Sequence, residues 1–153
     1  MKKALFIGRF QPLHKGHCYA IKNILEREDI GHLYIAIGSA DKEGTDDNPF
    51  SFKTRKKMLE KVFRKNIDEG KISILNLEDH ESDDEWINRV KSIAPDFNII
   101  FTGNDWTKRC LEPNHIVEKQ EFHQEKQLNG TYIRSRLKEG KDISGLVPEE
   151  VLK

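Results

Sequence analysis

Short apolar stretches alternate along the chain with longer segments whose apolar residues recur at helical spacing. The short stretches predict five strands, at residues 3–7, 32–37, 71–77, 97–101 and 115–119. The longer segments predict helices over residues 16–28, 51–66, 83–92, 130–139 and 147–152. Such alternation is typical of a parallel sheet with right-handed crossovers. The pattern therefore predicts the α/β class: a single Rossmann-like open parallel sheet of about five strands with helices on both faces.

The composition is that of one globular domain spanning residues 1–153. Its 26 basic and 26 acidic residues cancel, so we expect no nucleic-acid partner and no anionic membrane partner. No window approaches the ~20 apolar residues that a membrane helix needs, and residues 4–7 are too short for a signal peptide. Two cysteines, Cys18 and Cys110, are too few for a disulfide scaffold, which favours a cytoplasmic protein.

Polar, glycine-bearing turns follow three of the predicted strands, at residues 8–17, 38–51 and 102–105. In open parallel sheets, ligands bind beyond the carboxyl ends of the strands, where the strand order reverses. We therefore expect these three turns to meet there and to form the functional site.

The first turn, Gly8-Arg9-Phe10-Gln11-Pro12-Leu13-His14-Lys15-Gly16-His17, carries the most chemistry. It follows a strand and opens a helix, and helix N-termini attract anions through free N–H groups. Gly8 and Gly16 allow close approach of the backbone to a ligand, and Arg9 can bind a phosphate through two N–H groups. The turn lacks both the GxxxxGK[ST] and the GxGxxG phosphate-binding patterns. It predicts a phosphate site of another kind, with His14 and His17 at its centre.

Other interpretations of these residues stay open at this stage. His14, His17 and Cys18 could hold zinc, although the chain lacks the paired CxxC or HxxxH spacing that would complete four ligands. Arg55 lies in a basic run that suits either a solvated helix face or a phosphate contact.

The segment GRFQPLHKGH resembles the GRFQPxHxGH form of the HxGH motif, which characterises a superfamily of nucleotidyltransferases. This form is similar to that of the archaeal-type nicotinamide-mononucleotide (NMN) adenylyltransferases. The resemblance extends along most of the chain, through residues 38–40, 48–51, Arg55, Trp86, 101–104, 130–134 and 146–148. The sequence departs from the family pattern at Asn129, where the family has Ser, and at Asp83, where it often has Asn.

The resemblance implies that ATP and NMN are the substrates and that NAD and pyrophosphate are the products. It implies catalytic roles for His14, His17, Arg9 and Arg134. The implied ATP-binding residues are Gly8, Arg9, Phe10, His14, Gly16, His17, Gly103, Asn104, Thr131, Arg134 and Arg136. The implied acceptor-binding residues are Gln11, Ser39, Asn48, Phe50 and Trp86. Mg²⁺ would bind mainly through substrate phosphates, without a protein metal site, and the enzyme would be a homo-oligomer.

Two rival functions remain to be distinguished. A related nucleotidyltransferase could act on another phosphate acceptor, such as phosphopantetheine, flavin mononucleotide or an alcohol phosphate. A non-catalytic nucleotide-binding module would keep the phosphate-binding turn without turnover. Trp86 could also be an ordinary core residue.

Overall fold

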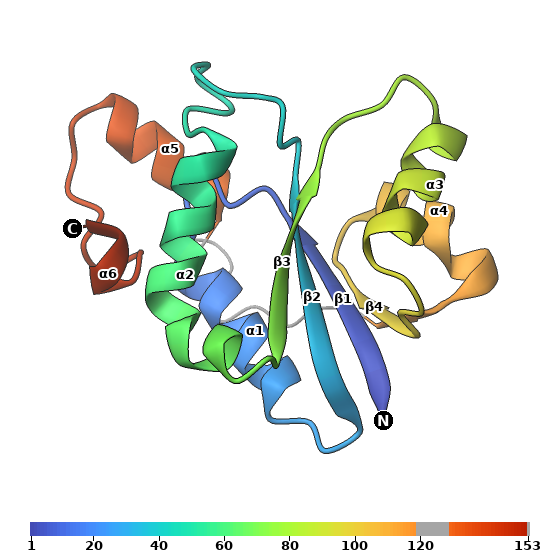
Figure 1. The fold of residues 1–153 in the computed structure, drawn as a ribbon. Helices are drawn as coiled ribbons and strands as arrows, with labels where there is room; N and C mark the ends of the chain where they lie inside the picture. The colour runs from blue at the N-terminus through green and yellow to red at the C-terminus, as the bar shows by residue number, and fades with distance from the viewer. Residues whose placement is uncertain (119–128, 153) are drawn as a thin grey trace.

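The computed structural model describes residues 1–118 and 129–152, and in this part of the chain five parallel strands form one sheet (Figure 1). The strands are β1 (Lys2–Gly8), β2 (Ile30–Gly38), β3 (Ile72–Leu77), β4 (Ile99–Phe101) and β5 (Ile116–Glu118). Their order across the sheet is β3-β2-β1-β4-β5. The order reverses between β1 and β4, so the carboxyl ends of these two strands mark the expected ligand-binding crevice.

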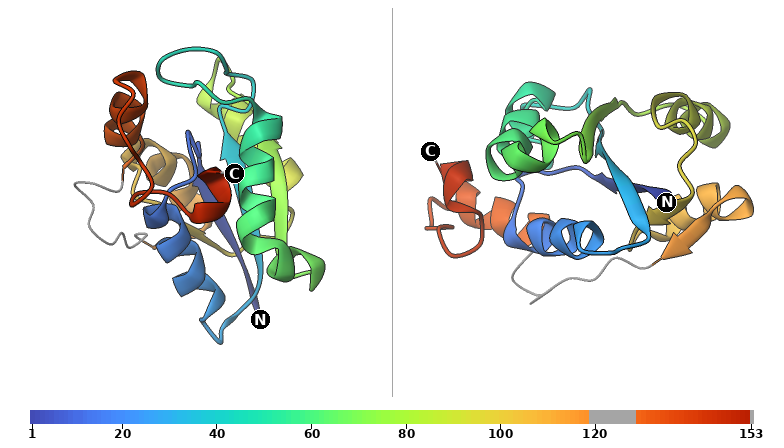
Figure 2. Two further views of the ribbon diagram at one scale, coloured as in Figure 1. Left: turned by 90° about the vertical axis from the view of Figure 1, so that its left-hand side faces the viewer. Right: turned by 60° about the horizontal axis from the view of Figure 1, so that its bottom comes forward.

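Helices cover both faces of the sheet (Figures 1 and 2). One face carries α1 (Lys15–Leu25), α2 (Phe52–Asp68), α5 (Gly130–Lys138) and α6 (Glu149–Leu152). The other face carries α3 (Asp83–Ile93) and α4 (Asp105–Leu111), which a 3₁₀ turn, η1 (Glu112–Asn114), follows. The predicted fold class is confirmed. No helix in the described residues is both long enough and apolar enough to cross a membrane.

The alternating side chains of the strands divide the core into two layers. Ala4 and Phe6 of β1 point to the layer beneath α1 and α2, whereas Leu5 points to the layer beneath α3 and α4. Continuous apolar runs such as 4–7 therefore reflect a strand that is buried on both faces. This burial makes β1 and β2 the rigid base of the loops that follow them.

Polar side chains start the helices at the predicted positions or close to them. Ser51 caps α2 by accepting from the N–H of Thr54, and Ser82 caps α3 by accepting from Glu85. Asn129 caps α5 in the same way, by accepting from Tyr132 at 2.8 Å. Asn and Ser are equally good caps, so the departure at residue 129 preserves the helix start.

The sequence pattern missed α4 and misplaced several boundaries. Residues 102–105 were expected to turn the chain, whereas Asn104 instead caps the seven-residue helix α4. The first helix ends at Leu25 rather than at residue 28, and the last begins at Glu149 rather than at residue 147. The fifth strand ends at Glu118, and the predicted final residue, Lys119, lies outside the described residues.

Candidate active site

Segments that are far apart in the sequence meet at the carboxyl edge of the sheet. Arg9, in the loop after β1, lies with its Nη1 3.5 Å from Oδ1 of Asn48, in the loop after β2. Arg134 of α5 donates from Nη1 to the carbonyl oxygen of Gln11 at 3.1 Å. The turn at residues 102–104 follows β4, which pairs directly with β1. The three predicted turns are therefore neighbours, and the N-terminal half of α5 joins them.

His14 and His17 form the start of α1 as a reciprocal pair. The N–H of His17 donates to Nδ1 of His14 at 3.3 Å, and the N–H of His14 donates to Nδ1 of His17 at 3.2 Å. This is a capping box in which imidazole nitrogens replace the usual oxygens. A ring nitrogen that accepts carries no proton, so in each neutral ring the proton is on Nε2. Both histidines therefore present an Nε2–H donor.

Both rings are also held in the neutral state. Burial and the nearby charge of Arg134 lower the pKa of His14 to about 4. Burial and the proximity of His14 lower the pKa of His17 well below its ordinary value. The two rings stack with centroids 3.7 Å apart, a geometry in which two positive charges would repel each other strongly. Near neutral pH the pair offers two uncharged hydrogen-bond donors.

Two arginines supply positive charge beside the histidines. Arg9 is exposed, and Arg134 is half-buried with Nη2 3.4 Å from Oγ1 of Thr131. Burial lowers the pKa of Arg134, and the charge of Arg9 lowers it further. Arg134 bonds to the carbonyl of Gln11, two residues along the loop from Arg9, so both arginines border the same loop. Together with the start of α1, they form an arrangement suited to bind a polyanion.

Gln11 ties the first two loops together through its side chain. The amide is 1% exposed, and its Nε2 donates to the carbonyl of Phe50 at 2.9 Å while its Oε1 accepts from the N–H of Phe50 at 2.8 Å. The predicted acceptor-binding residues Gln11, Asn48 and Phe50 are therefore neighbours. The Gln11 side chain links the loop after β1 to the loop after β2, and its backbone carbonyl accepts a hydrogen bond from Arg134.

Arg55 has a role that the sequence did not reveal. Its side chain is completely buried, so the interpretation as a solvated helix face is wrong. The guanidinium donates to six backbone carbonyls, those of Arg9, Gly38, Ser39, Ala40, Lys42 and Ser51. It thus fixes the loops after β1 and β2 to the start of α2. The basic run around it gave no signal of this burial, which depends on how the loops fold over α2.

The predicted adenine-side residues border a separate cavity. Thr102, Gly103, Asn104, Asp105, Lys108 and Val117 line a cavity of about 330 Å³ at the end of β4. Asn104 Oδ1 accepts from the N–H of Thr107, so this side-chain oxygen is engaged as a helix cap. Gly103 and Asn104 are both exposed residues in the lining of this cavity.

Trp86 lies in the second core layer and is 6% exposed. It packs against Trp106, with ring centroids 4.4 Å apart, and Trp106 donates from Nε1 to Oδ1 of Asp83 at 3.0 Å. The sequence drew no attention to Trp106, because its helix was not predicted. Asp83, at which the sequence departs from the family pattern, therefore has a hydrogen-bond partner. This bond orients the Trp106 ring, which packs over Trp86.

The remaining predicted residues are Gly8, Phe10 and Gly16, close to the start of α1, and Ser39 and Arg136, which lie on other elements. Gly8 and Phe10 support His17: a Cβ on Gly8 would lie 2.9 Å from the Phe10 ring, and that ring packs 4.6 Å from the ring of His17. Gly16 is buried within α1. Ser39 donates from Oγ to Asp79, and Arg136 donates from Nε to the carbonyl of Asp142 at 2.9 Å. The contact with Asp142 directs the Arg136 side chain away from Arg134, which lies two residues earlier in α5.

The zinc interpretation has no support in the geometry. Both Nδ1 atoms are engaged in the capping box, and Cys18 belongs to the buried core, where burial raises its pKa to about 12. Residues 1–118 and 129–152 contain no group of three or more His, Cys, Asp or Glu side chains that could hold a metal ion.

Comparison with known proteins shows which family the chain belongs to. A family model described as cytidylyltransferase-like matches residues 5–146. The nicotinamide-nucleotide adenylyltransferase of Methanococcus vannielii is 34% identical over 152 residues, covering 98% of this chain and 86% of the relative. That of Pyrobaculum aerophilum is 37% identical over 154 residues, covering 99% and 85%.

A solved structure agrees with these matches. A bifunctional NMN adenylyltransferase/ADP ribose pyrophosphatase from Francisella tularensis superposes with a TM-score of 0.74 at 27% identity. The match covers 93% of this chain and 43% of that longer chain. Fold and sequence together define a nucleotidyltransferase. The chain belongs to the cytidylyltransferase-like family and, within it, to the nicotinamide-nucleotide adenylyltransferases.

Proposed function

We propose that this enzyme joins ATP and NMN to give NAD and pyrophosphate. The observation that carries the proposal is the neutral pair His14–His17, which shares a loop with Arg9 and lies near Arg134 at the switch point of the sheet. The relatives from Methanococcus and Pyrobaculum, which match nearly the whole chain, bear the name of this activity.

The chemistry needs alignment and charge stabilisation more than it needs a base. An oxygen of the NMN phosphate attacks the α-phosphorus of ATP, and the bond from that phosphorus to the bridging oxygen of the β-phosphate breaks. Pyrophosphate leaves with the electron pair. A phosphate monoester has its second pKa near ~6, so the attacking oxygen is already ionised at neutral pH. The protein therefore has to bring two anions together and stabilise the charge that develops on the leaving group.

The histidines and arginines suit this demand. The Nε2–H groups of His14 and His17 would donate to oxygens of the reacting phosphates. Because both rings are neutral and fixed by the capping box, they need no reorganisation as negative charge shifts during the reaction. Arg9 would offset the repulsion between the two substrates. Arg134 and Thr131, at the start of α5, would hold the β- and γ-phosphates.

Residues around this centre would also hold the two ends of the product. The cavity beside Gly103 and Asn104 would take the adenosine moiety. Ser39, Asn48 and Phe50 would border the acceptor, and the nicotinamide ring would lie against Trp106 and the small exposed part of Trp86.

Mg²⁺ would arrive with ATP, held by substrate phosphates and water. The Francisella neighbour was solved with AMP and a Mn ion, which supports the use of a divalent cation. The described residues offer no cluster of metal ligands, so no side chain is assigned to the ion. We also propose that the protein is cytoplasmic and forms a homo-oligomer. Light scattering of the purified protein would test the oligomeric state.

The deciding experiment is turnover of the purified enzyme with ATP and NMN, followed as NAD formed. Phosphopantetheine, flavin mononucleotide and glycerol phosphate serve as rival acceptors, and pyrophosphate release is measured for each. We expect NMN to give the highest kcat/KM, and His17→Ala to lower kcat by about 10² to 10³-fold with the fold intact. Faster turnover with another acceptor, or ATP binding without turnover on any acceptor, would overturn the proposal.

A further inference from the structure

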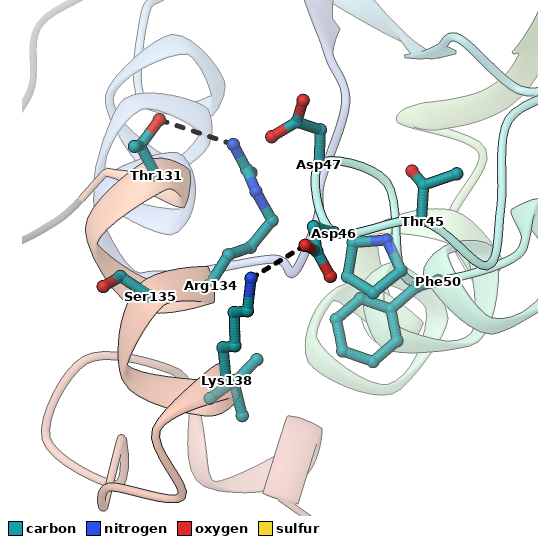
Figure 3. Close-up of a pocket in the computed structure, with 10 residues that line it drawn as sticks. Thr45, Asp46, Asp47, Phe50, Thr131, Arg134, Ser135 and Lys138 are labelled. Carbon is teal, nitrogen blue, oxygen red and sulfur yellow. Dashed lines mark hydrogen bonds and ion pairs between the residues drawn. The ribbon is translucent and has the colours of Figure 1, made fainter.

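The side chain of Arg134 folds back over the first turn of its own helix. Its Nη2 lies near Oγ1 of Thr131, three residues earlier, while its Nη1 continues to the carbonyl of Gln11 in the loop after β1. Figure 3 shows the guanidinium passing the N-terminal end of α5 on the side of the loop that carries Asp46 and Asp47. Residues along α5, from Thr131 to Lys138, line a cavity of about 510 Å³ together with that loop.

Gly130 lies directly beneath this guanidinium. A Cβ built on Gly130 would stand 2.5 Å from Nη1 of Arg134 and 3.6 Å from its Cζ. A separation of 2.5 Å is far inside van der Waals contact, so the observed position of Arg134 requires that residue 130 has no side chain. Gly130 is not needed for the backbone itself, because its φ lies outside the left-handed region.

We propose that Gly130 is a positioning residue for the transfer reaction, because its missing side chain is the space in which the Arg134 guanidinium reaches the histidine loop. The inference rests on the proposed function and deepens it. Arg134 is then set by two contacts with the protein before ATP binds, and it faces the same polyanion as Arg9. Gly130 acts through Arg134 and need not touch the substrate.

An alanine at residue 130 separates this role from a role in folding. The atom that the new methyl group meets is the tip of a flexible side chain, so Arg134 moves and the backbone of α5 stays in place. Alanine is also a better helix former than glycine. Gly130→Ala should therefore leave the melting temperature unchanged or raise it, while it displaces the guanidinium from the Gln11 carbonyl.

The experiment compares Gly130→Ala, Arg134→Ala, the double variant and a control, Gly145→Ala. A Cβ on Gly145 meets no described atom within 4 Å, and Gly145 has no part in the site. We expect Gly130→Ala to raise the KM for ATP by roughly ten- to a hundredfold, the range for one charge-assisted hydrogen bond. The KM for NMN should change little, and the double variant should be no worse than Arg134→Ala, because both changes remove the same interaction. Gly145→Ala should behave as wild type.

Three outcomes would overturn the inference. The first is a wild-type KM for ATP in Gly130→Ala. The second is a double variant whose loss equals the product of the two single losses, because that would show independent action. The third is a lowered melting temperature with equal losses for both substrates, which would make Gly130 a folding residue. If wild type forms no NAD, the proposed function fails, and calorimetric ATP binding to the same proteins decides the inference instead. Equal weakening of ATP binding in Gly130→Ala and Arg134→Ala supports the inference. Unchanged ATP binding in Gly130→Ala refutes it.

Discussion

His14→Asn is the variant that best tests whether the capping box fixes the chemistry of the histidine pair. Asparagine carries an oxygen, Oδ1, close to where histidine carries Nδ1, and it is among the best N-cap residues. The variant should therefore keep the hydrogen bond from the N–H of His17 and the start of α1. It loses the Nε2–H donor, the group that titrates and the ring that stacks on His17.

The structure gives the size of the expected pH effect. The pKa of His14 is about 4 in the folded protein and 6.5 when unperturbed. The unfolded chain therefore binds the proton more tightly, and stability falls as pH falls from 6.5 towards 4. The difference corresponds to on the order of 3 kcal/mol in full, most of which is lost by pH 4.5. Above pH 6.5 this group contributes no pH dependence.

Urea unfolding of wild type and His14→Asn from pH 7.5 to 4.5 measures this directly. The stability of wild type should fall more steeply with acid than that of the variant, by roughly 2–3 kcal/mol over the range. At pH 7.5 the variant should fold well, yet its kcat should be lower by about 10² to 10³-fold, because one transition-state donor is gone. Parallel stability curves would refute the buried, neutral state of His14. A variant with wild-type kcat would refute its role as a donor.

Two further changes test how the loops are held, and a third tests whether Arg136 contacts ATP. Gly8→Ala should overpack the Phe10 ring and cost roughly 1–3 kcal/mol in urea unfolding, with a lower kcat; an unchanged stability would mean that the ring can move aside. Arg55→Met removes a donor from six backbone carbonyls, of which those of Ser39 and Ser51 also accept from a backbone N–H, and should cost about 3 kcal/mol or more by calorimetry; an unchanged stability would contradict its structural role. Arg136→Ala should leave the KM for ATP unchanged in steady-state kinetics, because Arg136 bonds to the Asp142 carbonyl; a raised KM would place it at the phosphates.

The hydrophobic pattern was sufficient for the sheet because its central strands are buried on both faces. Runs such as 4–7 and 33–37 have no other stable location in a chain of this size. The pattern failed at α4, where seven residues, most of them polar, leave too little periodicity to detect. It also failed at Arg55, because a basic run on a helix predicts exposure and only the fold of two distant loops shows that one member is buried.

The position of the site could be predicted, but the way in which it is held could not. The turn after the first strand already contained the histidines, the arginine and the helix start. Its link to Phe50 depends on Gln11, a predicted acceptor-binding residue, whose side-chain amide pairs with backbone across 39 residues of sequence. Contacts of this kind arise from tertiary structure and leave no local periodicity in the chain.

The capping box also connects the stability of α1 to the chemistry of the site. The Nδ1 atoms of His14 and His17 must accept hydrogen bonds for the helix to begin, and for that reason the proton of each ring is on Nε2. Protonation of either ring would remove an acceptor from the helix start and add a charge beside Arg134 in a buried site. The fold thus disfavours the cationic state by the same contacts that present two neutral donors to a phosphate. In the proposed reaction, a neutral donor would not hold the departing pyrophosphate by ionic attraction. That charge would be left to the two arginines beside the pair, Arg9 and Arg134.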